Sequence, residues 1–328
     1  MIRTVSALLV AVVLLLLTGI AHGDHPVTIG DLVSVLIRSA GANPQIEMIV
    51  LDLRMPRVLF ALLVGAALAV AGAIAQAVMR NPLAEPGILG INAGAALAAM
   101  ILIVAFDTAP ITLLPWAGFA GASAMVATIY ILSWRNGTTS LRIILIGIGL
   151  SALAGAATTS LTVFGEIRDV QRAMIWLAGS VYHANWSGVQ VLALWLVAPL
   201  LLAFMSAREL DLIRFGDSAA QSLGQRVNLA RALMILLCTL LSGAAVAAAG
   251  LISFVGLVAP HMARRLVGPS HAKLIPASAL IGAALVMAAD LVGRTIIAPA
   301  QLPAGLVTAL IGAPFFAYLL WGRRHVAA

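Results

Sequence analysis

GAALAVAG, at Gly65 to Gly72, returns as GAAVAAAG at Gly243 to Gly250, 178 residues further along the chain. The same offset relates Pro82 to Pro260. The stretch therefore marks an internal duplication. It decides the fold because two related halves joined by an odd number of membrane spans lie upside down relative to each other, an arrangement typical of transporters that open alternately to two sides.

The composition of the chain is that of a membrane protein. Hydrophobic residues make up 62% of its 328 residues, charged residues only 9%, and the mean hydropathy is +1.09. A spanning helix needs about 20 apolar residues, and ten stretches qualify. The sequence thus predicts an all-α polytopic membrane protein, one domain over 1–328, with spans at 5–22, 57–79, 88–106, 112–134, 142–164, 190–206, 229–249, 251–267, 276–297 and 304–321.

The repeat halves, roughly 54–165 and 229–322, then hold spans 2–5 and 7–10. Five spans separate the two copies, so the prediction is an inverted repeat. The eighth span is the exception to a simple helix, because Gly256 and Pro260 interrupt it. A broken or partly re-entrant helix fits this span as well as a complete one.

The basic residues predict the orientation, because cytoplasmic loops collect Arg and Lys. With the N-terminus inside, 13 of the 19 basic residues are cytoplasmic and 6 are external. Both termini are therefore expected in the cytoplasm, with the chain in a bacterial inner membrane. The first span resembles a cleaved signal in its basic start and apolar run, but we expect it to be retained.

A phosphate-binding loop is absent from the sequence. The pattern GxxxxGK[ST] needs a lysine, and the single Lys273 is followed by Leu274. An ATP-driven mechanism therefore needs a partner that docks on the cytoplasmic side. The 207–228 loop is the longest predicted there, and Asp217 as N-cap with Gly224 at C′ predicts a short helix. That helix is either a docking element or an ordinary capped helix on the membrane surface.

Several long motifs resemble the FecCD-type permeases, the membrane subunits of ATP-driven importers for iron chelates, haem and cobalamin. The resemblance covers nearly the whole chain. It is carried by LRMPRVLFALLVGAALAVAGAIAQAVMRNPLAEPGILG (Leu53 to Gly90), DLIRFGDSAAQSLG (Asp211 to Gly224), GLISFVGLVAPHMARRLVGPSHAKLIPASALIGAALVMAADLVGR (Gly250 to Arg294) and PAQLPAGLVTALIGAPFF (Pro299 to Phe316).

The resemblance implies ten helices per subunit and a complex of several chains. Its partners are a second permease subunit (a copy of this chain or a paralogue), two ATPase subunits and an external substrate-binding protein. ATP and Mg would be bound by the ATPase, so no cofactor and no enzymatic activity are expected of this chain. Nucleic acid is not implied by the net charge of +7, which suits loops beside anionic lipid.

The resemblance also implies roles for three groups of residues. The residues implied to couple the chain to the ATPase are Asp217, Ala220 and Gly224. The residues implied to dock the binding protein are Arg54, Arg57 and Arg294. The residues implied to form a cytoplasmic gate are Asn81, Leu83, Thr139 and Ser140. From the residues alone, the arginines could equally snorkel to lipid headgroups, and the proline-rich gate segments could be plain turns.

Other polar residues narrow the function. Arg294 stands four residues after Asp290, so an ion pair is favoured over a proton relay. The six histidines form no metal-binding spacing, and Cys238 suits packing within a span. Gln301 departs from the resembling motif, which usually has Glu before Leu-Pro.

We therefore predict a permease subunit that imports a ferric siderophore or similar iron chelate by alternating access driven by ATP hydrolysis on a separate subunit. Haem and cobalamin are the alternative cargoes. A proton-coupled secondary transporter is the alternative from a different class.

Overall fold

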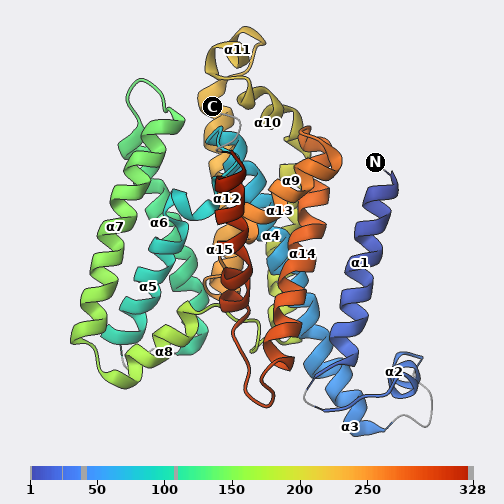
Figure 1. The fold of residues 1–328 in the computed structure, drawn as a ribbon. Helices are drawn as coiled ribbons and strands as arrows, with labels where there is room; N and C mark the ends of the chain where they lie inside the picture. The colour runs from blue at the N-terminus through green and yellow to red at the C-terminus, as the bar shows by residue number, and fades with distance from the viewer. Residues whose placement is uncertain (1, 24, 38–42, 107–109, 324–328) are drawn as a thin grey trace.

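The structure is a computed structural model that describes residues 2–23, 25–37, 43–106 and 110–323. Within those ranges the chain is helical, with no strand, and the long helices run side by side between two ends (Figure 1). One end carries the short helix α11 and the other carries α8, and the ends are named after these helices below. The prediction of an all-α membrane protein is confirmed.

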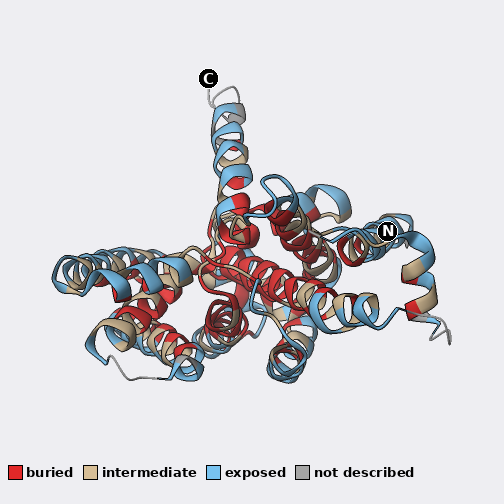
Figure 2. Ribbon diagram, turned by 90° about the horizontal axis from the view of Figure 1, so that it is seen from below, coloured by how far each residue is buried: buried red, intermediate tan, exposed pale blue. Residues whose placement is uncertain are grey.

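Three helices form the centre of the bundle. They are α4 (Met55–Val78), α12 (Val227–Ala249) and α14 (His271–Thr295). The apolar stretch containing α4 is 83% buried, whereas that of α7 is only 17% buried. A helix that is apolar all round and buried all round belongs in a core, and buried residues concentrate in the middle of the bundle when it is seen along its axis (Figure 2).

The first copy of the repeated motif explains how α4 packs so closely. A β-carbon on Gly65 would overlap the carbonyl group of Gly282 in α14, and one on Gly72 would overlap the backbone at Gly256. Small residues at such crossings let helix backbones approach in a membrane, where no hydrophobic drive presses them together. The repeated glycines therefore serve as contact points.

The remaining long helices surround this core. On one side α5 packs against α6 and α7, and on the other α1 packs against α14 and α9 against α4 and α12. Their bounds are α1 Ile2–Ala21, α5 Ile91–Ala105, α6 Leu114–Ser133, α7 Ser140–Phe164, α9 Trp186–Met205 and α15 Ala304–Arg323.

The ten predicted spans each coincide with a helix. Seven apolar stretches in the described part of the chain are long enough to cross a membrane. The other three predicted spans correspond to α5, α15 and α13 (Val255–Val267). Of these, α5 and α15 contain shorter apolar helices, and α13 has only 13 residues. At about 1.5 Å per residue α13 is shorter than the hydrocarbon core, so the total of ten crossings stays a prediction.

The eighth span begins later than predicted, and Gly256 and Pro260 do not interrupt it, because α13 runs continuously from Val255 to Val267 with Pro260 inside it. Residues 250–253 are not helical, and α13 begins only after Phe254, whose φ of 67° lies in the left-handed region. Non-glycine residues adopt that region rarely. The segment turns sharply here in the middle of the protein.

The two ends carry the short helices. At the α11 end lie α10 (Ala207–Arg214) and α11 (Asp217–Ser222), and here also α1 begins and α15 ends (Figure 1). At the α8 end lie α2, α3 and α8. The bounds are α2 Ile29–Leu36, α3 Pro44–Glu47, the π-helical η1 Met48–Arg54, η2 Pro86–Leu89, η3 Ile111–Leu113 and α8 Ile167–Leu177.

The helix packing follows the repeat. The offset relates α4 to α12, and the next two helices in order, α5 and α6, then correspond to α13 and α14. In this correspondence α4 packs on α14 as α12 packs on α6, and α5 packs on α6 as α13 packs on α14. The helices α4 and α12 run in opposite directions (Figure 1), as inversion requires. The symmetry of the complete halves, 54–165 and 229–322, stays a prediction.

The close crossing of α4 and α14 generates a stability prediction. Replacing Gly65 by Ala places a methyl group against the Gly282 carbonyl, and overpacking of this kind costs about 1 to 3 kcal/mol. We expect Gly65→Ala to lower the thermal unfolding temperature of the detergent-purified protein. Gly155→Ala in α7 is the matched control because a β-carbon there meets nothing within 4 Å. Equal unfolding temperatures for the two variants would contradict the packing role.

Candidate functional site

The predicted coupling segment forms two short helices at the α11 end. Gly224 has a φ of 85°, the left-handed conformation expected at C′. The prediction for Asp217 was wrong in detail, because Gly216 occupies the N-cap and Asp217 is the first helical residue. Its carboxylate bonds to Arg231 instead of capping the helix, with Asp217 Oδ1 and Arg231 Nη2 2.7 Å apart.

The first of these helices, α10, is fastened to the start of α14. Asp211 Oδ1 accepts the backbone N–H of His271 at 3.0 Å and lies 2.6 Å from its Nδ1, while Oδ2 accepts from Ser270 Oγ at 3.2 Å. A carboxylate is stabilised at a helix N-terminus by the exposed N–H groups there. Nearby, Arg214 Nη1 donates to the Pro269 carbonyl at 2.7 Å, so α10 is held to the core at two points.

The outer face of the coupling segment is apolar at two places. Phe215 is 73% exposed and Leu223 is 63% exposed. Ala220 is fully buried on the inner side of α11. Its small side chain therefore lets α11 lie close to the bundle and does not face outward. The coupling roles of Asp217, Ala220 and Gly224 stay predictions.

The two predicted gate segments meet at the end of α4. Ser140 Oγ donates to the carbonyl of Val78 at 2.6 Å, which ties the α6–α7 connection to the last residue of α4. Thr139 caps α7 through the Arg142 N–H, and Asn81 Oδ1 accepts the N–H of Leu83 at 2.9 Å. The structure thus brings Asn81, Leu83, Thr139 and Ser140 into one region, and their role as a gate stays a prediction.

A carboxylate lies beside this region. Burial raises the pKa of the Glu85 carboxyl, and a hydrogen bond from the backbone of Phe254 partly offsets that rise. Phe254 immediately precedes α13, so Glu85 holds the N-terminal end of this helix. The segment that follows α4 therefore contacts the break in the second half of the chain.

The three arginines at the α8 end point into the protein. Arg54 is 6% exposed, and its guanidinium donates to the carbonyls of Ile20 and Ala21, at the end of α1, and of His25. Arg294 is 3% exposed and donates to the carbonyl of Gly19. Both satisfy carbonyl groups at the end of a helix. The docking role predicted for Arg54, Arg57 and Arg294 stays a prediction, and in this conformation only small parts of their surfaces face outward.

Asp290 is the centre of the charge cluster at this end. Its Oδ1 lies 2.8 Å from Arg57 Nη2, and its Oδ2 lies 3.6 Å from Arg294 Nε. The ion pair with Arg294 agrees with the sequence prediction, whereas the pair with Arg57 was not predicted. Arg57 Nη1 also donates to Gln301 Oε1 at 2.9 Å. One described carboxylate thus faces two guanidinium groups.

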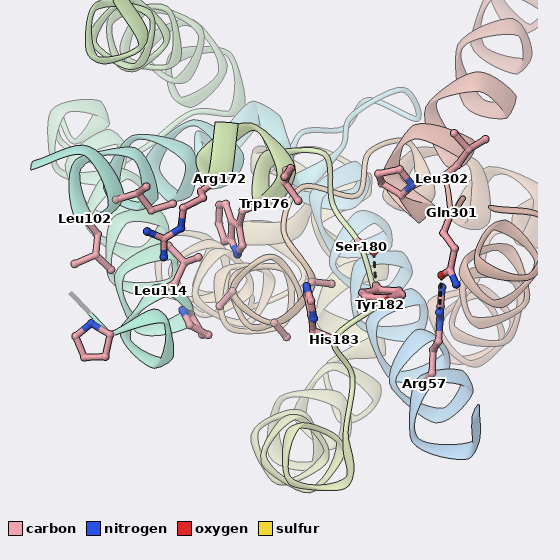
Figure 3. A pocket seen from close by; sticks show the side chains of 18 of the residues that line it. Arg57, Leu102, Leu114, Arg172, Trp176, Ser180, Tyr182, His183, Gln301 and Leu302 are labelled. Carbon is pink, nitrogen blue, oxygen red and sulfur yellow. Dashed lines mark hydrogen bonds between the residues drawn. The ribbon is translucent and has the colours of Figure 1, made fainter. Parts of the chain in front are cut away.

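A cavity of about 710 Å³ opens beside this cluster. Arg57 and Gln301 line one side, and Arg172 and Trp176 of α8 lie on the other, with Tyr182 between them (Figure 3). The Tyr182 ring lies 5.3 Å from the Arg57 guanidinium carbon, in cation–π contact. The cavity therefore offers aromatic faces together with positive charge at the α8 end.

No group of three His, Cys, Asp or Glu side chains suited to a metal ion occurs among the residues that the structure describes. Cys238 is a buried free thiol in α12. That the chain binds no cofactor and no metal stays an expectation.

A tightly packed core of long apolar helices, with an irregular segment between α12 and α13, is typical of a membrane transport subunit. The chain belongs to the FecCD transport family, which it matches over residues 9–322. The rival class of secondary transporter that the inverted repeat first suggested is therefore not favoured.

Relatives of known type agree with this membership. The chain is 46% identical to the probable siderophore transport system permease protein YfhA of Bacillus subtilis (strain 168), covering 85% of this chain and 83% of the relative. It is 38% identical to the hemin transport system permease protein HmuU of Yersinia pestis, with 98% of each covered. A metal-chelate type ABC transporter solved in an inward-facing conformation superposes with a TM-score of 0.89 at 28% identity, covering 98% of this chain and 100% of that chain.

The sequence interpretation missed the partners that bury several of these residues. Arg231 is one of the 13 basic residues counted as cytoplasmic, and it is 0% exposed. Its position just inside a predicted span was the available signal, because an ionisable residue in a span points to a specific partner. The Arg57–Asp290 pair joins residues 233 positions apart, and no local pattern in the sequence indicates it.

The cluster at Asp290 generates the second prediction. Asp290→Asn leaves Arg57 and Arg294 without their shared carboxylate, and loss of one partner of a buried ion pair costs about 3 to 5 kcal/mol. We expect a clear fall in thermal unfolding temperature in detergent. The control is Arg172→Gln, which removes the Arg172–Asp169 pair of 3.5 Å whose arginine is 45% exposed, and such pairs contribute about 0 to 1 kcal/mol. A fall no larger than that of the control would show that Asp290 is not structurally central.

Proposed function

We propose that this chain is the permease subunit of an ATP-binding-cassette importer that moves a ferric chelate, such as a siderophore complex, into the cytoplasm by alternating access. The single observation that carries the proposal is the match to the FecCD transport family over residues 9–322. Relatives named as siderophore, ferric citrate and hydroxamate permeases support the cargo class.

The proposed complex contains two permease subunits, either two copies of this chain or this chain with a paralogue. Two ATPase subunits, binding ATP and Mg, would dock at the α11 end, and a substrate-binding protein at the α8 end. The exposed Phe215 and Leu223 support the first assignment, since apolar side chains on a surface segment suit a protein groove. The proposal includes an α11 end and both termini in the cytoplasm, and a chain that lies in a bacterial inner membrane.

The cavity at the α8 end supports a cargo with negative groups and flat rings. Arg57 and Arg172 supply positive charge, and Trp176 and Tyr182 supply ring faces. Citrate and haem complexes carry carboxylates, and catechol groups are aromatic, so a haem cargo fits the same chemistry. The relative named as a hemin permease makes haem the second candidate.

The decisive experiment is purification of the chain with its native partners, followed by reconstitution into vesicles. We expect a P-loop ATPase to co-purify and labelled ferric chelate to enter only with ATP and the binding protein. Recovery of no ATPase, together with uptake that follows a proton gradient, would instead establish a secondary transporter. A panel of ferric citrate, ferric hydroxamate and hemin then identifies the cargo.

Gln301 offers a test of the proposed cavity. Gln301→Glu places a carboxylate where Oε1 now lies, 2.9 Å from Arg57 Nη1, and so cancels positive charge at the cavity wall. We expect uptake of ferric citrate to fall about fivefold, or roughly 1 kcal/mol, while uptake of an uncharged ferric hydroxamate stays unchanged. Gln301→Met, which adds no charge, is the matched control. An equal effect of Gln301→Glu on both chelates would argue against charge recognition in this cavity.

A further inference from the structure

The side chain of Arg231 joins the coupling segment to the gate region. It lies in the second turn of α12 and is 0% exposed. Arg231 Nη2 lies 2.7 Å from Asp217 Oδ1, at the start of α11. Arg231 Nη1 donates to the carbonyl of Thr138 and lies 3.3 Å from the Thr138 hydroxyl. One guanidinium group therefore holds two segments that are far apart in the sequence.

The connection continues from Thr138 to the core. Two residues further on, Ser140 Oγ donates to the carbonyl of Val78 at 2.6 Å, the last residue of α4. Buried hydrogen bonds thus link the start of α11 to the end of α4 through Arg231 and residues 138–140. Thr139 and Ser140 of the predicted gate lie on this path, and Asn81 and Leu83 follow Val78 within five residues.

The α6–α7 connection is too firmly held to move by itself. Asn228, three residues before Arg231 on the same face of α12, has its Oδ1 3.3 Å from the Thr138 N–H. Arg142 Nη1 donates to the carbonyls of Ser133 and Gly137 at 3.0 and 3.2 Å. Because these bonds brace the connection from both sides, a displacement of Arg231 moves the connection as a unit.

Asp217 is the point at which α11 enters this path. Among the described residues of α11, Asp217 is the one whose side chain forms ion pairs outside the 207–228 segment. Its Oδ1 lies 2.7 Å from Arg231 Nη2 and 4.0 Å from Arg80 Nη1. Arg80 is 39% exposed, so water weakens that second contact. Arg231 is buried, so its positive charge needs the Asp217 carboxylate as a partner to offset the loss of hydration.

We propose that Arg231 is a positioning residue that transmits movement of α11 to the gate at residues 138–140 and the end of α4. The planar, forked guanidinium suits this role because two nitrogens bond two different segments at once. A lysine keeps the charge but has a single nitrogen and cannot bridge them in the same way. This inference rests on the proposed function, because α11 moves only if an ATPase docks there.

The test measures gate movement directly in the complete complex. In a Cys238→Ala background, Leu83→Cys reports the gate through its rate of reaction with a maleimide, with and without ATP. In the reference protein we expect ATP to change that rate. We expect Arg231→Lys and Asp217→Asn to reduce the ATP-induced change about tenfold, within the usual range of coupling between sites. Arg135→Gln removes an exposed charge from the same connection and is expected to leave the change intact.

The variants separate transmission from its alternatives. A purely structural charge pair predicts a normal response for Arg231→Lys, because the charge is kept. If a variant weakened docking, less ATPase would co-purify with it. Arg231 is fully buried and so does not contact the ATPase, and we expect Arg231→Lys to recover the usual amount. If Arg231→Lys does not assemble, Asp217→Asn decides the question with the amount of bound ATPase as its control.

The inference is overturned if Asp217→Asn and Arg231→Lys respond to ATP like Arg135→Gln. Failure of the proposed function has a different signature, because then the reference protein itself recovers no ATPase and shows no response to ATP.

Discussion

Hydrocarbon offers no hydrogen bonds, so backbone polar groups and charges that this chain buries need partners inside the protein. Arg54 binds the carbonyls at the end of α1, Asp290 lies between two guanidinium groups, and Arg231 is shared by two segments. Each of these buried side chains bonds to a segment outside its own helix. The fold therefore depends on polar contacts that fasten one helix end to another.

The same constraint explains where the backbone is irregular. The break at residues 250–254 exposes N–H groups in the interior, and the Glu85 carboxylate accepts one of them, from Phe254. The tight crossings at Gly65 and Gly72 leave little space around the neighbouring helices. An irregular segment is thus tolerated at membrane depth because protein surrounds it, and it lies beside the region where the two halves of the chain meet.

Helix positions and the family could be predicted from the sequence because both depend on local patterns. Apolar runs predict spans, and long motifs around Asn81 and Asp217 indicate the family. The partners of buried charges could not be predicted in the same way. Arg57 and Asp290 carry no local sign that they meet, and the inward direction of Arg54 depends on where α1 ends. The amphipathic α8, in a loop expected to be external, was also missed, because its 11 residues are too few and too polar to appear as a span.

The central helix α4 connects the two ends of the molecule. Its first turn carries Arg57, in the cluster with Asp290 and Gln301, and its last residue, Val78, accepts the hydrogen bond from Ser140. Between them the helix is buried almost throughout and crosses α14 too closely to bend or slide freely. The cavity at one end and the hydrogen bond from Ser140 at the other therefore involve the same confined element.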